Sequence, residues 1–272
     1  MALVEYHHVV TPASIRDVVE HLWVVRHGEG EPEHEVLLPD GRGCVVVAAG
    51  EPGRRVDALT GQVSLDRGGV RGIATRPVVR TQSGPSVRVG AQLTPWGLAR
   101  LSPHALLVDA VAPVATLLGG PAVEACALAA DRGDDAGAVG LLADALATAA
   151  RFEDPELELL VPVLQGIDAQ RGLVRAADVA RTARVPVPQL HAWTSRHLGV
   201  EPAVYLAAVR FSAFVREAVG PGPVRPHDAL AAIRWYVQAG YPPREVERFT
   251  GHRPVELRRI EQGIAAALAP VA

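Results

Sequence analysis

The stretch Ala176–Phe211, AADVARTARVPVPQLHAWTSRHLGVEPAVYLAAVRF, decides the fold of the second half of the chain. Two short helices, Ala176–Ala183 and Val187–Leu198, are predicted on either side of a tight turn at Arg184–Val185. Proline and glycine mark the helix boundaries, at Pro186, Gly199 and Pro202. Two short helices joined by a tight turn are typical of a helix-turn-helix. The second helix of that unit fits the major groove of B-DNA and reaches base edges with side chains near its amino end.

The second helix carries the side chains that would contact a duplex. Gln189 and His191 are the predicted base readers, because they lie near its amino end and Gln can hydrogen-bond adenine in bidentate fashion. The predicted phosphate contacts, which supply affinity rather than sequence choice, are Arg181, Arg184, Arg196, His197, Arg244, Arg248 and Arg253. A packing helix with solvated arginines gives the same pattern, since all 27 Lys and Arg positions of this chain are arginine.

Composition places the chain among globular proteins, with 272 residues of which 49% are hydrophobic and 21% charged. The chain has no long apolar stretch and only two cysteines, so we expect a cytoplasmic protein without a membrane helix or disulfide scaffold. The net charge of -3 conceals an asymmetry: residues 1–159 hold 13 Arg and 21 Asp or Glu, whereas residues 160–272 hold 14 and 9. A basic carboxyl-terminal part is typical of a module that faces a polyanion, although ordinary scatter produces it too.

The first 100 residues are predicted to form a β-sandwich or small barrel, because short segments rich in Val and Leu alternate with Gly and Pro turns. Predicted strands lie at residues 3–10, 35–38, 44–48, 56–59, 72–73, 78–79 and 87–93. One helix is predicted to begin at Thr11–Ser14, with an apolar face at helical spacing that comprises Ile15, Val18, Val19 and Leu22.

From about residue 97 the apolar spacing becomes helical. Ala- and Leu-rich helices are predicted at Val123–Leu128 and Val139–Ala149, and six or seven more helices beyond Pro155. Asp228–Ala239 and Pro243–Thr250 repeat the two-helix pattern of the first unit. The aromatic residues expected in the core of this helical part are Tyr205, Phe211, Phe214, Trp235 and Phe249.

Several runs, taken together, resemble the AraC-type transcriptional regulators. Leu198–Phe211 looks like the junction after the first recognition helix, and Gly240-Tyr241 followed by Thr250–Pro254 is similar to the second motif of that family. Runs that resemble the sensor domain of some members are HLWVV at 21–25, LPDG at 38–41, GIATRPV at 72–78 and VGAQLTPWGLARL at 89–101. The resemblance implies an α+β chain. Its parts would be a cupin-like β-barrel sensor domain at 1–118, a helical linker with a possible dimerisation surface at 119–154, and an all-α double helix-turn-helix DNA-binding domain at 155–272.

The sequence departs from the family pattern in both helix-turn-helix units. Ala192 and Thr194 stand where an arginine and a core aromatic are usual, and Trp193 is expected to supply the missing bulk. The second unit is about one helical turn short between Tyr241 and Gly251. We therefore expect the first unit to read bases and the second to have lost part of its contact surface.

A ligand-responsive regulator that binds duplex DNA and a small-molecule effector is the first hypothesis, and homodimers are possible. The predicted effector contacts are His21, Trp23, Asp40, Cys44 and Trp96. Simple structural roles are the alternatives: Trp96 as a plug at the barrel end and Asp40 as a turn residue.

No metal or cofactor is expected, because His7 and His8 point to opposite faces of a strand and H-E-x-x-H is absent. The alternative function is a regulator-derived protein that has lost DNA reading and uses its pocket as a binding accessory or enzyme. His7, His8 or His21 would then act as acid or base near Asp40.

Overall fold

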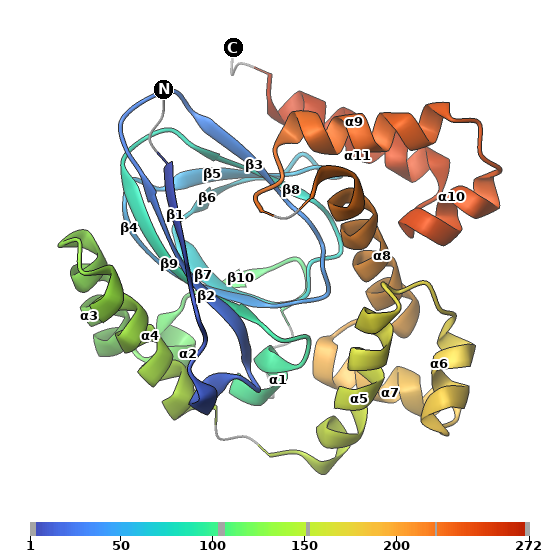
Figure 1. Ribbon diagram of the computed structural model, residues 1–272, viewed down its shortest axis with the longest axis horizontal. Coiled ribbons are helices and arrows are strands. Elements are labelled where there is room, and N and C mark those ends of the chain that lie inside the picture. Colours follow the sequence, from blue (N-terminus) through green and yellow to red (C-terminus); the bar gives the residue numbers. More distant parts are fainter. Residues whose placement is uncertain (1–3, 103–106, 151–152, 221, 270–272) are drawn as a thin grey trace.

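The computed structural model describes residues 4–102, 107–150, 153–220 and 222–269, in which β-strands are followed by helices (Figure 1). The strands are β1 Val4–Val9, β2 Val19–His27, β3 Glu33–Leu37, β4 Cys44–Gly50, β5 Gly53–Asp57, β6 Val63–Asp66, β7 Gly68–Arg71, β8 Val78–Gln82, β9 Ser86–Leu93 and β10 Val111–Ala112. They form two antiparallel sheets: sheet A in the order β1-β2-β9-β4-β7-β10, and sheet B in the order β3-β8-β5-β6.

The helices are α1 Gly97–Leu101, α2 Ala115–Leu118, α3 Gly120–Asp131, α4 Asp135–Ala149, α5 Pro155–Ala169, α6 Ala176–Ala183, α7 Val187–Leu198, α8 Pro202–Val219, α9 Pro226–Gln238, α10 Pro243–Thr250 and α11 Pro254–Ala267. A β-domain followed by helices confirms the predicted α+β class. The bounds predicted for α6, α7 and α10 are those observed: proline and glycine bound α7 and α10, and α6 ends at the left-handed residue Arg184. In the described part of the chain, no single helix is long and apolar enough to span a membrane.

Sheet A separates two environments by the two-residue alternation of its strands. On β9, Val87, Val89, Ala91 and Leu93 are buried in one core with the helices α3 and α4. Arg88 and Gln92, the alternate residues, line the space between the two sheets. The helices predicted at 119–154 therefore cover the outer face of sheet A (Figure 1).

The helix α8 belongs to two further cores. Its amino-terminal half contributes Tyr205, Leu206 and Val209 to a core shared with α5, α6 and α7. Its carboxyl-terminal half contributes Phe211, Phe214 and Val215 to a core shared with α9, α10 and α11. Because this second core also includes Val36, Val56 and Val79 of sheet B, the end of the chain packs directly on the β-domain.

Close backbone approaches fix α9 and α11 on sheet B. The Val36 N–H donates to the Val224 carbonyl at 2.8 Å, which joins β3 to the segment before α9. On α11, a Cβ at Gly263 would lie 1.6 Å from the carbonyl oxygen of Ala58, just after β5. Only glycine permits this contact between the helix and the β-domain.

Three sequence predictions of the fold are wrong. Residues 72–73, predicted as a strand, follow β7, which ends at Arg71, and belong to no strand. The early helix is a single 3-10 turn, Ala13–Ile15, and Val19 already begins β2. Its apolar residues are buried as predicted, but on a strand and the turn that leads into it. Trp235 and Phe249 were expected in the core and are 58% and 39% exposed.

The glycine contact of α11 gives a test of domain docking. Gly263→Ala is expected to lower the free energy of unfolding by about 1–3 kcal/mol, because the added methyl must displace the Ala58 carbonyl. Gly166→Ala, on α5 with no neighbour near the new methyl, is the control and is expected to stabilise the protein by about 0.5–1 kcal/mol. Urea unfolding measures both, and equal effects of the two substitutions would contradict the docking contact.

Candidate functional site

The helices α6 and α7 form a helix-turn-helix whose second helix has one buried face and one exposed face. The turn passes through Arg184 in the left-handed region, φ 56°, and Gly199 ends α7 at φ 75°. The inward face of α7 consists of Leu190, Trp193, Thr194, His197 and Leu198, at helical spacing. Trp193 is buried as predicted and fills the core beside the small residue Thr194.

The outward face of α7 is free of acidic residues in its first turn. Gln189 and Arg184 are exposed, as is Arg181, which pairs with Asp178 one turn earlier on α6 at 3.0 Å. His191 is half-buried. The first turn of α7 thus exposes Gln189 beside the apolar residues Val187 and Pro188.

At the carboxyl-terminal end of α7, the polar side chains contact acidic residues at the start of α5. Arg196 pairs with Glu156 at 3.0 Å and Asp154 at 3.5 Å, both at the start of α5. His197 was predicted to lie near phosphates; this is wrong, because its side chain is only 5% exposed and faces Glu156. The cause is helical spacing, which places residue 197 on the same face as Leu190 and Trp193.

The second unit presents mixed charge. Arg244 and Arg248 are exposed on α10, but Glu245 and Glu247 are exposed on the same short helix. Arg253 is engaged with Glu256 in the capping box of α11, at 2.8 Å. Carboxylates repel a phosphate backbone, so α10 is poorly suited to groove binding.

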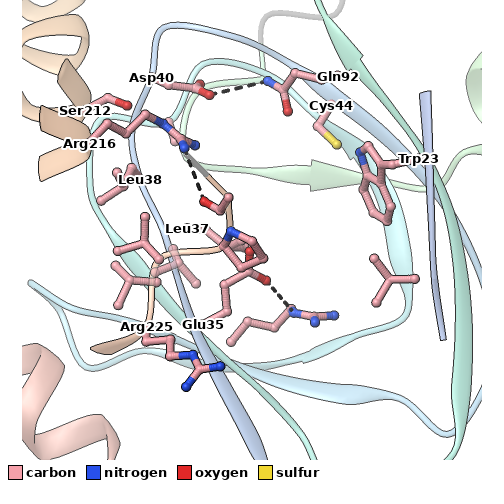
Figure 2. A pocket seen from close by; sticks show the side chains of 18 of the residues that line it. Trp23, Glu35, Leu37, Leu38, Asp40, Cys44, Gln92, Ser212, Arg216 and Arg225 are labelled. Carbon is pink, nitrogen blue, oxygen red and sulfur yellow. Dashed lines mark hydrogen bonds and ion pairs between the residues drawn. The ribbon is translucent and has the colours of Figure 1, made fainter. Parts of the chain in front are cut away.

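A cavity of about 1560 Å³ lies between the two sheets and reaches α8 (Figure 2). Trp23, Cys44 and Gln92 of sheet A line one side, and Glu35 and Leu37 of β3 line another. The helix α8 closes the cavity with Val209, Ser212, Ala213 and Arg216. Figure 2 shows Ser212 and Arg216 across the cavity from Trp23.

Four of the five predicted effector contacts line this cavity: His21, Trp23, Asp40 and Cys44. Trp96 does not; it is 7% exposed, packs in the core with Ile73 and Leu157, and donates through Nε1 to the Asp17 carbonyl at 2.7 Å. The prediction of Trp96 as an effector contact is therefore wrong. Its place at the start of α1 agrees with the alternative role of a plug.

Aromatic side chains form part of the cavity wall. The ring of Trp23 lies over Gly90 on the neighbouring strand, where a Cβ would be 2.1 Å from the ring. Tyr6 stacks on Trp23 with 6.4 Å between ring centroids, and His8 stacks on His21 with 5.0 Å. His7 is not part of the lining, in keeping with the alternation expected for adjacent strand residues.

Asp40 joins the cavity to the helical part. Its carboxylate accepts from the Arg42 backbone N–H at 3.0 Å and from Gln92 Nε2 at 3.4 Å. Burial raises the pKa of Asp40 to about 6, although the nearby charge of Arg42 opposes the shift. Arg42 itself pairs with Glu20 and with Asp168 at the end of α5, each at 2.7 Å.

The turn that carries Asp40 packs directly on α8. Gly41 has φ +76°, and a Cβ there would lie 2.8 Å from the ring of Tyr205 and 2.9 Å from Val209. The motif LPDG at 38–41 therefore needs its glycine both for the turn and for the close approach to α8. A change in the conformation or charge of Asp40 would therefore be transmitted by direct contacts to α8, the helix that joins the two helix-turn-helix units.

The polar interior of the barrel was missed by sequence reasoning. The interior arginine cluster comprises Arg55, Arg71, Arg80 and Arg88, with Asp66 as its central carboxylate. Arg88 is 1% exposed and holds Asp66 at 2.9 Å, while Arg80 pairs with Glu35 at 3.3 Å. The available signal was the alternation of Arg88 and Gln92 with buried apolar residues on β9.

Comparisons with known proteins give distant likenesses. No protein-family model and no curated protein matches the chain. Among solved structures, the chain is similar to ToxT from Vibrio cholerae O395, with 8% identity and a TM-score of 0.40 over 96% of this chain and 93% of that one. Unsaturated fatty acid-bound ToxT from Vibrio cholerae strain SCE256 gives 10% and 0.37 over 94% of each chain. The AraC-like transcriptional activator CuxR gives 10% and 0.31 over 79% of this chain and 88% of that one.

The raised pKa of Asp40 predicts a pH-dependent stability difference. The folded state binds this proton more tightly than the unfolded state, whose Asp pKa is about 3.9, so the wild type loses stability as pH rises from about 4 to 6. Asp40→Asn lacks that loss. Its stability relative to the wild type should therefore rise by about 2–3 kcal/mol across this window and stay level above pH 7.

Urea unfolding of both proteins between pH 4 and 8 measures this difference. Asp144→Asn, on the exposed side of α4, controls for the removal of a negative charge. A difference between wild type and Asp40→Asn that does not change with pH would show that Asp40 titrates as an ordinary carboxylate.

Proposed function

We propose that the protein is an AraC-type transcriptional regulator that binds duplex DNA through α7 and an effector through the barrel cavity. The observation that carries the proposal is the carboxylate-free first turn of α7, where Gln189 is exposed, in a helix-turn-helix that packs on an apolar core. A helix presented in this way fits the major groove.

Gln189 is the base reader of this proposal. Its amide NH2 can donate to adenine N7 while its carbonyl oxygen accepts from the adenine N6 amino group, the bidentate pairing that discriminates bases, with His191 beside it as a second contact. Arg184 and Arg181 flank the amino end of α7 and are placed to contact phosphates, which adds affinity for any sequence. Arg196 contributes less, since its charge is already matched by Glu156 and Asp154.

The second unit plays a smaller part in this binding mode. Glu245 and Glu247 accompany Arg244 and Arg248 on α10, so its surface gains little from counterion release. A monomer would then read a single short element. Two such elements would be read by a homodimer, for which the covering helices α3 and α4 offer the surface that the sequence predicted.

A ligand bound in the cavity would regulate DNA binding. A ligand in it contacts α8, the helix shared by the cores of both helix-turn-helix units, through Val209, Ser212 and Arg216. The Asp40 turn, packed on Tyr205, is a second connection. Such a ligand alters DNA binding only if it prefers one arrangement of α8 over another.

Acid–base chemistry in the same cavity is the second candidate, and the geometry favours it less. Among the described residues, neither His8 nor His21 hydrogen-bonds to Asp40; the two rings stack on each other and Asp40 contacts Arg42 and Gln92. Burial, together with the neighbouring His8, lowers the pKa of His21. These features fit a binding wall better than a proton-transfer pair.

Selection of duplexes from a random-sequence library by the full chain tests DNA binding. The wild type is expected to enrich a short sequence that contains adenine, with affinity that falls steeply as salt rises. Gln189→Ala is expected to lose about 1–3 kcal/mol of discrimination at one base position while it still binds DNA. Failure of the wild type to enrich any sequence at low salt would contradict α7 as a reader.

Two controls separate reading from affinity. Gln165→Ala, an exposed glutamine on α5, is expected to leave the selected sequence unchanged. Arg184→Ala is expected to weaken all duplexes alike and to reduce the salt dependence by about one phosphate contact. If Gln189→Ala and Arg184→Ala changed binding in the same way, their assigned roles would be wrong.

A further inference from the structure

Two members of the interior arginine cluster have too few acceptors. Arg80 is matched by Glu35 at 3.3 Å and His27 at 3.2 Å, and Arg88 by the carboxylate and carbonyl of Asp66, each at 2.9 Å. Arg55, by contrast, makes no ion pair with any described residue, and its Nη1 is buried without a protein acceptor. Arg71 reaches only Asp66, at 3.9 Å, and its Nε is likewise buried and unpaired.

Charge does not balance around Asp66. This single carboxylate serves Arg88 directly and Arg71 at longer range, while Arg55 has none of its own. Burial, followed by repulsion from Arg71, lowers the pKa of Arg55 to about 10, so the Arg55 guanidinium remains charged at neutral pH. Buried charges are ordinarily paired. Arg55, which has no ion pair among the described residues, and Arg71, which has only the long contact to Asp66, together lack one negative charge, and a bound anion could supply it.

The residues that line the whole cavity also carry more positive than negative charge. Its lining includes nine arginines, Arg42, Arg55, Arg71, Arg76, Arg80, Arg88, Arg171, Arg216 and Arg225. It includes six carboxylates, Glu20, Glu31, Glu33, Glu35, Asp40 and Asp168. Residues 1–118 hold 11 Arg and 12 Asp or Glu, so the cavity is positive inside a domain that is nearly neutral overall. Scatter of arginines from a biased composition does not produce this separation, because solvated arginines lie outside.

We infer that the effector is an organic anion whose acid group lies between Arg55 and Arg71. The inference rests on the proposed function in that it takes the cavity as the effector site. Arg71 is the cross-strand partner of Cys44, so the acid group would lie at the Cys44 wall of the cavity. Trp23 and Tyr6 lie on the same sheet, and their rings would contact the apolar part of the effector.

The two guanidiniums of Arg55 and Arg71 determine which chemical groups the site can bind. Each guanidinium presents parallel N–H donors that match the two oxygens of a carboxylate, or those of a sulfate or phosphate group. A neutral molecule of the same shape leaves both charges unpaired. The site should therefore discriminate by charge before it discriminates by shape.

The test uses the full chain with 2-naphthoate, its neutral analogue 2-naphthamide, and inorganic sulfate at constant ionic strength. Calorimetry should show 2-naphthoate binding at least about tenfold more tightly than the amide. Arg55→Met and Arg71→Met should weaken 2-naphthoate by about 10- to 100-fold. Arg54→Met is the matched control: it lies next to Arg55 on β5, does not line the cavity, and should bind as the wild type does.

Thermal unfolding provides a readout that does not depend on the size of the organic probe. Sulfate should raise the unfolding temperature of the wild type but not of Arg55→Met. Ligand-free Arg55→Met should itself unfold at a higher temperature than the wild type, because it no longer buries an unpaired charge. If Arg55→Met does not fold, Arg55→Lys takes its place and should retain part of the 2-naphthoate affinity.

Three results would overturn the inference: equal binding of acid and amide, 2-naphthoate affinity unchanged in both methionine variants, or no response of the wild type to either anion. DNA selection on the same proteins separates this inference from the proposed function. Recovery of specific DNA without an anion response contradicts the anion site alone. An anion response without DNA recovery contradicts the regulator alone.

Discussion

The helix α8 packs against three parts of the molecule at once. These shared contacts limit how the parts can move relative to one another. One half lies in the core of the first helix-turn-helix and the other half in a core that includes sheet B. Its remaining face closes the barrel cavity, and the Gly41 turn presses against Tyr205. Since protein interiors are close-packed, a shift of α8 that suits a ligand must be accommodated by both helical units.

Charge is distributed in the opposite sense to what the two halves of the sequence suggest. The β-domain buries Arg80 and Arg88 inside, where Glu35, His27 and Asp66 partly satisfy them. In the basic helical part, several arginines are instead neutralised on the surface, as Arg196 is by Glu156 and Arg253 by Glu256. The net charge of a segment therefore predicted neither the site proposed for a polyanion nor the site proposed for a small anion.

Local signals in the sequence were sufficient for the helices and insufficient for the site. Proline and glycine fixed the bounds of α7 and α10, and helical spacing explains why Trp193 is buried. The same spacing, applied to His197, would have placed it inside. The predicted early helix was wrong because Val19 and Leu22 can be buried in a helix or in a strand, and only pairing with β9 decides between them. Trp23, Asp40 and Cys44 were found from the sensor-like runs, whereas the interior arginine cluster depends on which strands face each other.

In the proposed function, α7 and the cavity are coupled through α8, and such coupling must act in both directions. Hydrogen–deuterium exchange of the full chain, with and without the duplex it selects, measures this directly. We expect added DNA to slow exchange in α7 and also to change it in α8 and in the Leu38–Arg42 turn. Changes confined to α6 and α7 would contradict the coupling.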